Sequence, residues 1–132
     1  MRAIFGAAEA GAAVSLARDG RLLVSAEGSA SADLLALLER VLREAGADAR
    51  DIREIAVDRG PDGFSTVRRR VAAATGLSRA LGASLAAVSG LSPEEAAALP
   101  SSDFSLRAVV VPLYAGAPNI TAAKKKKTWT TR

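Results

Sequence analysis

The sequence contains no cysteine and no histidine. Without cysteine there is no disulfide and no thiol nucleophile, and without histidine the commonest metal ligand is missing. Histidine is also the usual general base near neutral pH. The remaining Asp and Glu residues are scattered and form no evident acid–base pair or metal motif. We therefore expect no catalytic residue and no bound metal.

Long apolar runs and aromatic residues are also scarce. No apolar stretch approaches the roughly 20 residues that a membrane-spanning helix needs, and the amino-terminal stretch does not have the pattern of a signal peptide. These features favour a cytoplasmic protein without a membrane partner. Aromatic residues make up 4% of the chain while 49% of its residues are hydrophobic, so the core must consist mainly of Ala, Leu and Val.

The positive charge is concentrated at one end of the chain. The net charge is +4, yet every lysine lies close to the carboxyl terminus. We therefore predict one domain over residues 1–117 and a basic, disordered tail over residues 118–132. Such a tail is more often a solubilising end than a binding element, but basic residues beside an aromatic ring could also contact RNA. The candidate RNA-contacting residues are Lys124, Lys125, Lys126, Lys127 and Trp129.

The order of apolar patterns predicts an α/β fold. Three short strands come first, with Asp19-Gly20 as a hairpin turn between the second and third. Helical spacing of apolar residues then alternates with short buried strands, which gives the order βββ-α-β-α-β-α-β and a mixed sheet of three antiparallel and two parallel strands. The predicted strands are 2–5, 12–17, 22–26, 55–57, 85–88 and 106–113, and the predicted helices are 33–45, 64–81 and 93–99.

The first two helices each carry more apolar or small residues than one buried stripe requires. In the first helix, Leu35 and Leu42 lie off the centre of the apolar stripe. In the second, small residues recur every four positions around Gly76, which lets another backbone approach closely. These residues either extend the packing inside the chain or form a partner surface. The candidate interface residues are Leu35, Leu38, Leu42, Val67, Val71, Ala72, Gly76 and Ala80.

A glycine-containing loop precedes the second helix and is a candidate anion site. Free backbone N–H groups and the helix dipole favour a phosphate at such a position. The candidate phosphate-loop residues are Gly60, Pro61, Gly63 and Ser65. Asp62 in the same loop would repel a phosphate and could instead cap the helix, so a capped structural turn is favoured. ATP is therefore not expected as a cofactor.

Three consecutive arginines, Arg68 to Arg70, follow this loop. They cannot share one helix face, because neighbouring residues are about 100° apart. Either they are solvated and form local ion pairs with Asp58, Asp62 or Asp33, or they contact an acidic partner or tRNA phosphates. The structural interpretation is slightly favoured.

Residues 52–98 resemble the central region of the TsaB/YeaZ family. The resemblance lies in the Gly60-Pro61-Asp62-Gly63-Phe64-Ser65-Thr66 loop, in Ala80-Leu81-Gly82 at the end of the helix, and in Val88-Ser89-Gly90-Leu91 after the next strand. The upstream helix and amino-terminal hairpin are similar to the family as well. Asp62 departs from the family pattern, which has glycine there, and Gly6-Ala7-Ala8 replaces its Asp-Thr-Ser turn. The chain is thus identified as a truncated and degenerate member.

The resemblance implies a single lobe of the actin-like ATPase (RNase H-like) type. It also implies a non-catalytic scaffold in the threonylcarbamoyl modification of adenosine 37 of tRNA. In that pathway a TsaB-like protein pairs through two helices with a TsaD-like catalytic subunit or with itself. A TsaE-like ATPase completes the complex, and tRNA is contacted only indirectly. Two alternatives stay open: a nucleotide-binding enzyme of the actin-like class, and a degenerate interaction module outside tRNA modification.

Overall fold

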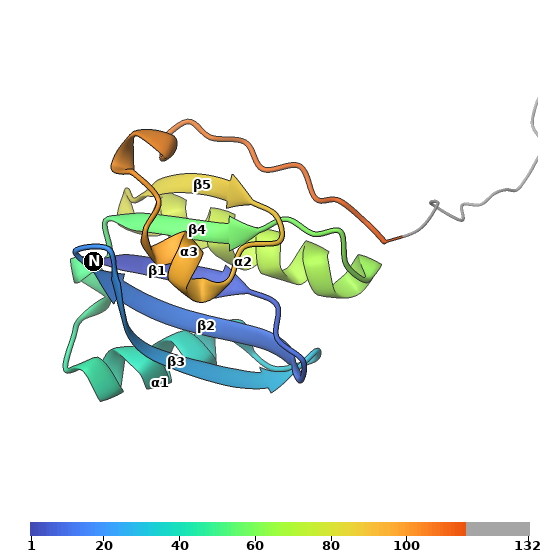
Figure 1. Cartoon of the computed structure of the whole chain (residues 1–132), viewed down its shortest axis with the longest axis horizontal. Helices are drawn as coiled ribbons and strands as arrows, with labels where there is room; N and C mark the ends of the chain where they lie inside the picture. The colour runs from blue at the N-terminus through green and yellow to red at the C-terminus, as the bar shows by residue number, and fades with distance from the viewer. Residues whose placement is uncertain (116–132) are drawn as a thin grey trace, which may run out of the picture.

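The computed structural model describes residues 1–115 of the 132-residue chain (Figure 1). The described residues form one five-stranded sheet and three α-helices. The strands are β1 (Arg2–Gly6), β2 (Gly11–Arg18), β3 (Arg21–Ser29), β4 (Glu54–Asp58) and β5 (Ser84–Val88). The helices are α1 (Leu34–Ala45), α2 (Phe64–Leu81) and α3 (Pro93–Ala97), with short 3-10 helices at Ala49–Asp51 and Ser101–Asp103.

The sheet has the strand order β3-β2-β1-β4-β5. β1 pairs with β2 in antiparallel and with β4 in parallel orientation, and β5 extends the parallel half. The predicted α/β class, with three antiparallel strands and two further parallel ones, is confirmed. The chain reaches β4 through α1 and β5 through α2, because parallel strands require a crossover connection.

The β2–β3 hairpin turns at the predicted dipeptide. Asp19 and Gly20 have φ angles of 54° and 77°, so both occupy the left-handed region. A type I′ turn requires positive φ at both central residues, and Asp-Gly satisfies this at low cost. This turn fixes the register in which Arg18 lies opposite Arg21.

Helices α1 and α2 cover the same face of the sheet. Asp33 caps α1 by accepting hydrogen bonds from the N–H groups of Leu35 and Ala36, and Gly46 ends the helix at a φ of 65°. α2 begins and ends at the predicted residues, with Gly82 in the same left-handed conformation. Both helices contribute to the larger core, whose fully buried members include Phe5, Val14, Leu16, Val41, Ile52, Ile55, Val57, Val67 and Ala74.

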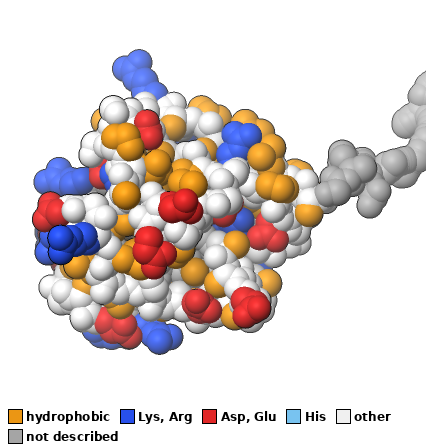
Figure 2. All heavy atoms as spheres, viewed as in Figure 1, with side chains coloured by type: hydrophobic (Ala, Val, Ile, Leu, Met, Phe, Trp, Pro, Cys, Tyr) orange, Lys and Arg blue, Asp and Glu red, His pale blue; other side chains and the backbone are white. Residues whose placement is uncertain are grey.

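Helix α3 lies on the opposite face of the sheet, in front of the strands in Figure 1. It packs on a smaller core of Ile4, Ala17, Ala56, Ala86, Ala96, Ala97 and Phe104. Ser92 and Glu95 form a reciprocal capping box, as the Ser-Pro-Glu-Glu pattern predicts. Acidic and apolar side chains are interspersed on this face (Figure 2).

The strand predicted at residues 106–113 does not form, so this part of the prediction is wrong. Ser105, which immediately precedes the segment, forms an isolated bridge with Leu85 of the edge strand β5, and at the other end the Leu113 N–H donates to the Arg59 carbonyl. The side chains of the segment still alternate: Val109 and Val111 are exposed, whereas Ala108 and Val110 pack against the larger core. The segment thus has the apolar character that suggested a strand, but it does not pair with the sheet as a ladder. The apolar side chains of this segment lie along the edge of the face in Figure 2.

Candidate functional site

The loop between β4 and α2 is held by hydrogen bonds to its own carboxylates. The Asp58 Oδ1 atom accepts a bond of 2.9 Å from the Gly60 N–H, and the Asp62 Oδ1 atom accepts one of 2.8 Å from the Gly63 N–H. Gly60 has a φ of 98° and lies against the backbone carbonyl of Leu113, where a Cβ atom would clash. Glycine at this position is therefore required by both conformation and space.

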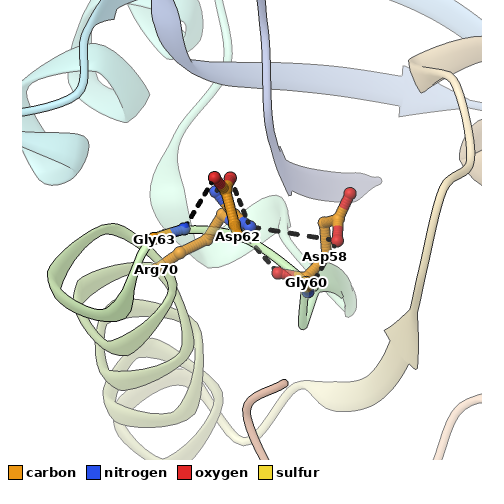
Figure 3. A network of polar contacts seen from close by, with 5 residues as sticks. All are labelled: Asp58, Gly60, Asp62, Gly63 and Arg70. Carbon is orange, nitrogen blue, oxygen red and sulfur yellow. Dashed lines mark hydrogen bonds and ion pairs between the residues drawn. The ribbon is translucent and has the colours of Figure 1, made fainter. Parts of the chain in front are cut away.

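Arg70 lies beneath this loop and is only 1% exposed. Its Nε donates a hydrogen bond of 2.7 Å to the Asp58 carbonyl oxygen. Its two terminal nitrogens each lie 3.4 Å from the Asp62 Oδ2 atom, and Nη2 lies 3.9 Å from the Asp58 carboxylate. Figure 3 shows the guanidinium reaching from α2 to both acidic residues. The buried charge is thus balanced by two carboxylates of the loop.

This network occupies the groups that a phosphate would use. The Gly60 and Gly63 N–H groups already donate to carboxylates, and a phosphate placed there would face the negative charges of Asp58 and Asp62. Pro61 has no N–H group, and exposed Ser65 lies in the first turn of α2. Asp62 does not cap α2 as the sequence suggested: the N-cap is Gly63, which has no side chain to do so.

The three arginines have three different environments. Arg70 forms the ion pairs with Asp58 and Asp62 that the structural interpretation predicted, but it is buried and not solvated. Arg69 donates a hydrogen bond of 3.1 Å to the Ala32 carbonyl, and the Arg68 guanidinium lies 5.1 Å from the centre of the Phe64 ring. Sequence reasoning missed the buried arginine, although position 70 lies three residues after Val67, on the buried stripe of α2.

The eight candidate interface residues separate into two groups. Leu38, Leu42, Val67 and Val71 are buried in the larger core, so their side chains pack within the chain and offer no surface to a partner. The other four residues are exposed, with Leu35 on α1 and Ala72, Gly76 and Ala80 on α2. The expectation that all eight side chains are available to a partner is therefore wrong, and only these four remain candidates.

Neighbouring exposed side chains enlarge this surface. We define the α2 outer face as the exposed residues Ser65, Arg68, Arg69, Ala72, Gly76, Arg79 and Ala80. Leu35, which is 52% exposed, lies beside it across a shallow hollow of about 410 Å³ between α1 and α2, lined also by Arg69 and Ala73. Nothing lies within 4 Å of the position that a Cβ atom on Gly76 would take, so this part of the face is open.

A second polar cluster joins the amino terminus to α3. The Arg2 guanidinium forms a 2.9 Å ion pair with Glu54, and its Nη1 donates to the carbonyls of Ala96, Ala97 and Leu99. Partial burial alone would raise the pKa of Glu54, but hydrogen bonds from Ser101 and Arg2 and nearby positive charges outweigh it and lower that pKa. These contacts attach α3 to the sheet.

Within residues 1–115 no group of three His, Cys, Asp or Glu side chains is arranged to hold a metal ion. A search of the same residues for helices sufficiently long and apolar to cross a bilayer finds none. The candidate RNA-contacting residues Lys124 to Lys127 and Trp129 lie outside the described residues.

No protein-family model and no curated protein matches this sequence. Solved structures do match, and two of them cover 67% of the chain, each with a TM-score of 0.59. The first is YeaZ from Pseudomonas aeruginosa, at 31% identity. The second, at 30%, is described as an uncharacterized protein with similarity to peptidase YEAZ from Pseudomonas aeruginosa. The predicted resemblance to the YeaZ family is confirmed.

The matched region corresponds to one actin-like lobe of YeaZ, as the resemblance implied. The chain spans 43% and 42% of the lengths of these two proteins, less than half of each.

Proposed function

We propose that this YeaZ-like chain is a non-catalytic scaffold subunit of the machinery that attaches threonylcarbamoyl to adenosine 37 of tRNA. It pairs through α1 and the α2 outer face with a TsaD-like catalytic subunit. A TsaE-like ATPase belongs to the larger assembly, tRNA is contacted indirectly, and the complex works in the cytoplasm. The identity and fold shared with YeaZ over 67% of the chain support this assignment.

The observation that carries the proposal is the open surface on α1 and α2. Exposed Leu35 lies beside an outer face whose centre, Ala72 and Gly76, has almost no side chain. A helix of a partner can approach such a face closely, and burial of Leu35 would contribute hydrophobic stabilisation. The opposite side of both helices is already occupied by the core of the chain, so this is the side that remains for a partner.

Two further features support the non-catalytic part of the proposal. The chain has neither His nor Cys, and the loop that resembles a phosphate site is filled by the contacts of Asp62 with Gly63 and Arg70. The loop therefore serves to position the first turn of α2.

Substitution at Gly76 tests the pairing surface without disturbing the core. A leucine at position 76 would project into open space from an exposed helical position, so Gly76→Leu should fold at least as well as the wild type. We expect it to weaken binding to a purified TsaD-like subunit at least tenfold by calorimetry. The matched control, Gly76→Ala, adds one methyl group and should weaken binding less. Unchanged affinity of Gly76→Leu would show that pairing does not use this face.

A further inference from the structure

The α2 outer face carries charge of one sign only. Helix α2 contains four arginines and no acidic residue. Arg70 points inward and is balanced by Asp58 and Asp62, whereas Arg68, Arg69 and Arg79 are exposed. The three exposed arginines thus lie on the same side of the helix as Ala72 and Gly76.

The arginines lie at the two ends of the face and leave its middle free. Positions 69 and 79 are ten residues apart, which corresponds to about 15 Å along a helix at 1.5 Å per residue. Ala72 and Gly76 lie between them, with neither a long side chain nor a charge. A helix packed across this middle would have a positive group near each end of the contact.

Neighbouring charges do not compensate for these arginines. On α1 the exposed charges are two acids and two arginines, and Arg40 and Glu44 already form an ion pair of 3.3 Å. Asp33 lines the same hollow as Arg69, but one of its carboxylate oxygens caps the first turn of α1. The combined surface of α1 and α2 remains positive.

Two-fold pairing of this face with a second copy would bring like charges together. In an antiparallel pair centred between Ala72 and Gly76, the Arg69 end of one helix meets the Arg79 end of the other. In a parallel pair each arginine meets its own counterpart. Both arrangements place arginine opposite arginine, because a two-fold interface uses the same patch twice. Like charges in contact oppose association and select against such a partner.

We infer that the face on α1 and α2 selects an acidic helical surface of a different protein and rejects a second copy of this chain. The inference rests on the proposed function, because it names the chemistry of the partner at the same face. The partner surface presents small residues opposite Ala72 and Gly76 and carboxylates opposite Arg69 and Arg79. A nucleic acid fits less well, because the uncharged middle of the face interrupts the row of arginines.

Charge reversal at Arg79 tests this inference. In Arg79→Glu the new carboxylate would lie opposite Arg69 of a second copy. An antiparallel pair would contain two such contacts, one from each copy. We expect the wild-type chain to sediment as a monomer at micromolar concentration and Arg79→Glu to self-associate at least tenfold more tightly. The same variant should bind a purified TsaD-like subunit at least tenfold more weakly. Wild-type binding to that subunit should also weaken as salt is raised, because exposed ion pairs are screened.

The control is Arg21→Glu, which makes the same change in net charge on β3, at the opposite edge of the sheet from β4 and β5. It should alter neither self-association nor partner binding. A wild-type dimer, or equal behaviour of the two variants, would overturn the inference. So would binding of bulk tRNA that Arg79→Glu abolishes and Arg21→Glu preserves.

The two proposals can fail separately. If Arg79→Glu dimerises but neither the wild type nor this variant binds the TsaD-like subunit, the proposed partner is wrong. The inference that the arginines prevent self-pairing then stands. If the subunit binds wild type and Arg79→Glu equally, pairing stands and the acidic character of the partner is wrong.

Discussion

Arg70 donates a 2.7 Å hydrogen bond to the backbone carbonyl of Asp58, which ties the second turn of α2 to the end of β4. The same guanidinium lies 3.4 Å from the Asp62 carboxylate. One buried side chain thus joins the strand, the loop and the helix. The direction in which α2 leaves the sheet, and so the placement of its outer face, depends on this contact.

Removal of the Arg70 charge should destabilise the fold strongly. Arg70→Met keeps an unbranched side chain in the core but leaves the Asp58 carbonyl and the Asp62 carboxylate without their partner. Breaking a buried ion pair on one side costs about 3 kcal/mol. Urea unfolding at neutral pH measures the loss. Arg69→Met is the control, and since Arg69 is exposed with one hydrogen bond to Ala32, it should cost less than about 1 kcal/mol. Equal losses would contradict the role given to Arg70.

The burial of Arg70 shows where the sequence was insufficient. The apolar stripe of α2 predicted the helix and its buried face, and position 70 belongs to that stripe by spacing. Three adjacent arginines nevertheless look alike in sequence, and charged residues are rarely buried without partners. The sequence offered Asp58 and Asp62 as partners for any of the three arginines, and only the fold of the loop brings both carboxylates to Arg70.

Four of the eight predicted interface residues are buried, for a related reason. Spacing identified two amphipathic helices, and the predicted ranges 33–45 and 64–81 agree with the observed ones to within one residue. It could not decide which edge of a wide apolar stripe the sheet covers. That choice depends on how α1 and α2 cross the sheet, which buries Leu42 and leaves Leu35 exposed.

Two glycines in open surroundings should respond to alanine in opposite directions. Gly20 and Gly76 both have space for a Cβ atom. Gly20 has a φ of 77°, so Gly20→Ala should destabilise the protein by about 1 kcal/mol through backbone strain. Gly76 lies within α2, so Gly76→Ala should stabilise it by about 1 kcal/mol through helix propensity. Thermal or urea unfolding measures both, and a loss of stability in Gly76→Ala would contradict its open placement.

The Arg2–Glu54 pair should give stability that disappears in acid. The folded-state pKa of Glu54 is lowered, so the pair contributes fully above a pH of about 4.5, the ordinary pKa of glutamate. This contribution is lost as the pH falls through the lower folded-state pKa. Urea unfolding of wild type and Glu54→Gln between about pH 6 and pH 3 measures it. The stability difference should be constant near neutrality and shrink in acid.

In the comparison of wild type with Glu54→Gln, the contributions of other acidic groups to the pH dependence cancel. The pKa of exposed Asp48 is also lowered, chiefly by a backbone hydrogen bond from Arg50, but this group is the same in both proteins. A difference between wild type and Glu54→Gln that does not change with pH would show that the pair contributes no pH-dependent stability.

Arg2 should hold α3 on the sheet through the shape of its guanidinium. The Nη1 atom donates to three carbonyls at the end of α3 while Nε and Nη2 bind Glu54, and the group lies 4.2 Å from the centre of the Phe104 ring. A lysine ammonium cannot span these partners. Arg2→Lys should therefore cost about 2 kcal/mol and accelerate hydrogen exchange in α3 at least tenfold. The matched control is Arg50→Lys, in an exposed pair with Asp48, which should change little. Acceleration spread evenly over all strands would instead indicate global destabilisation, and α3 would then not depend on Arg2 in particular.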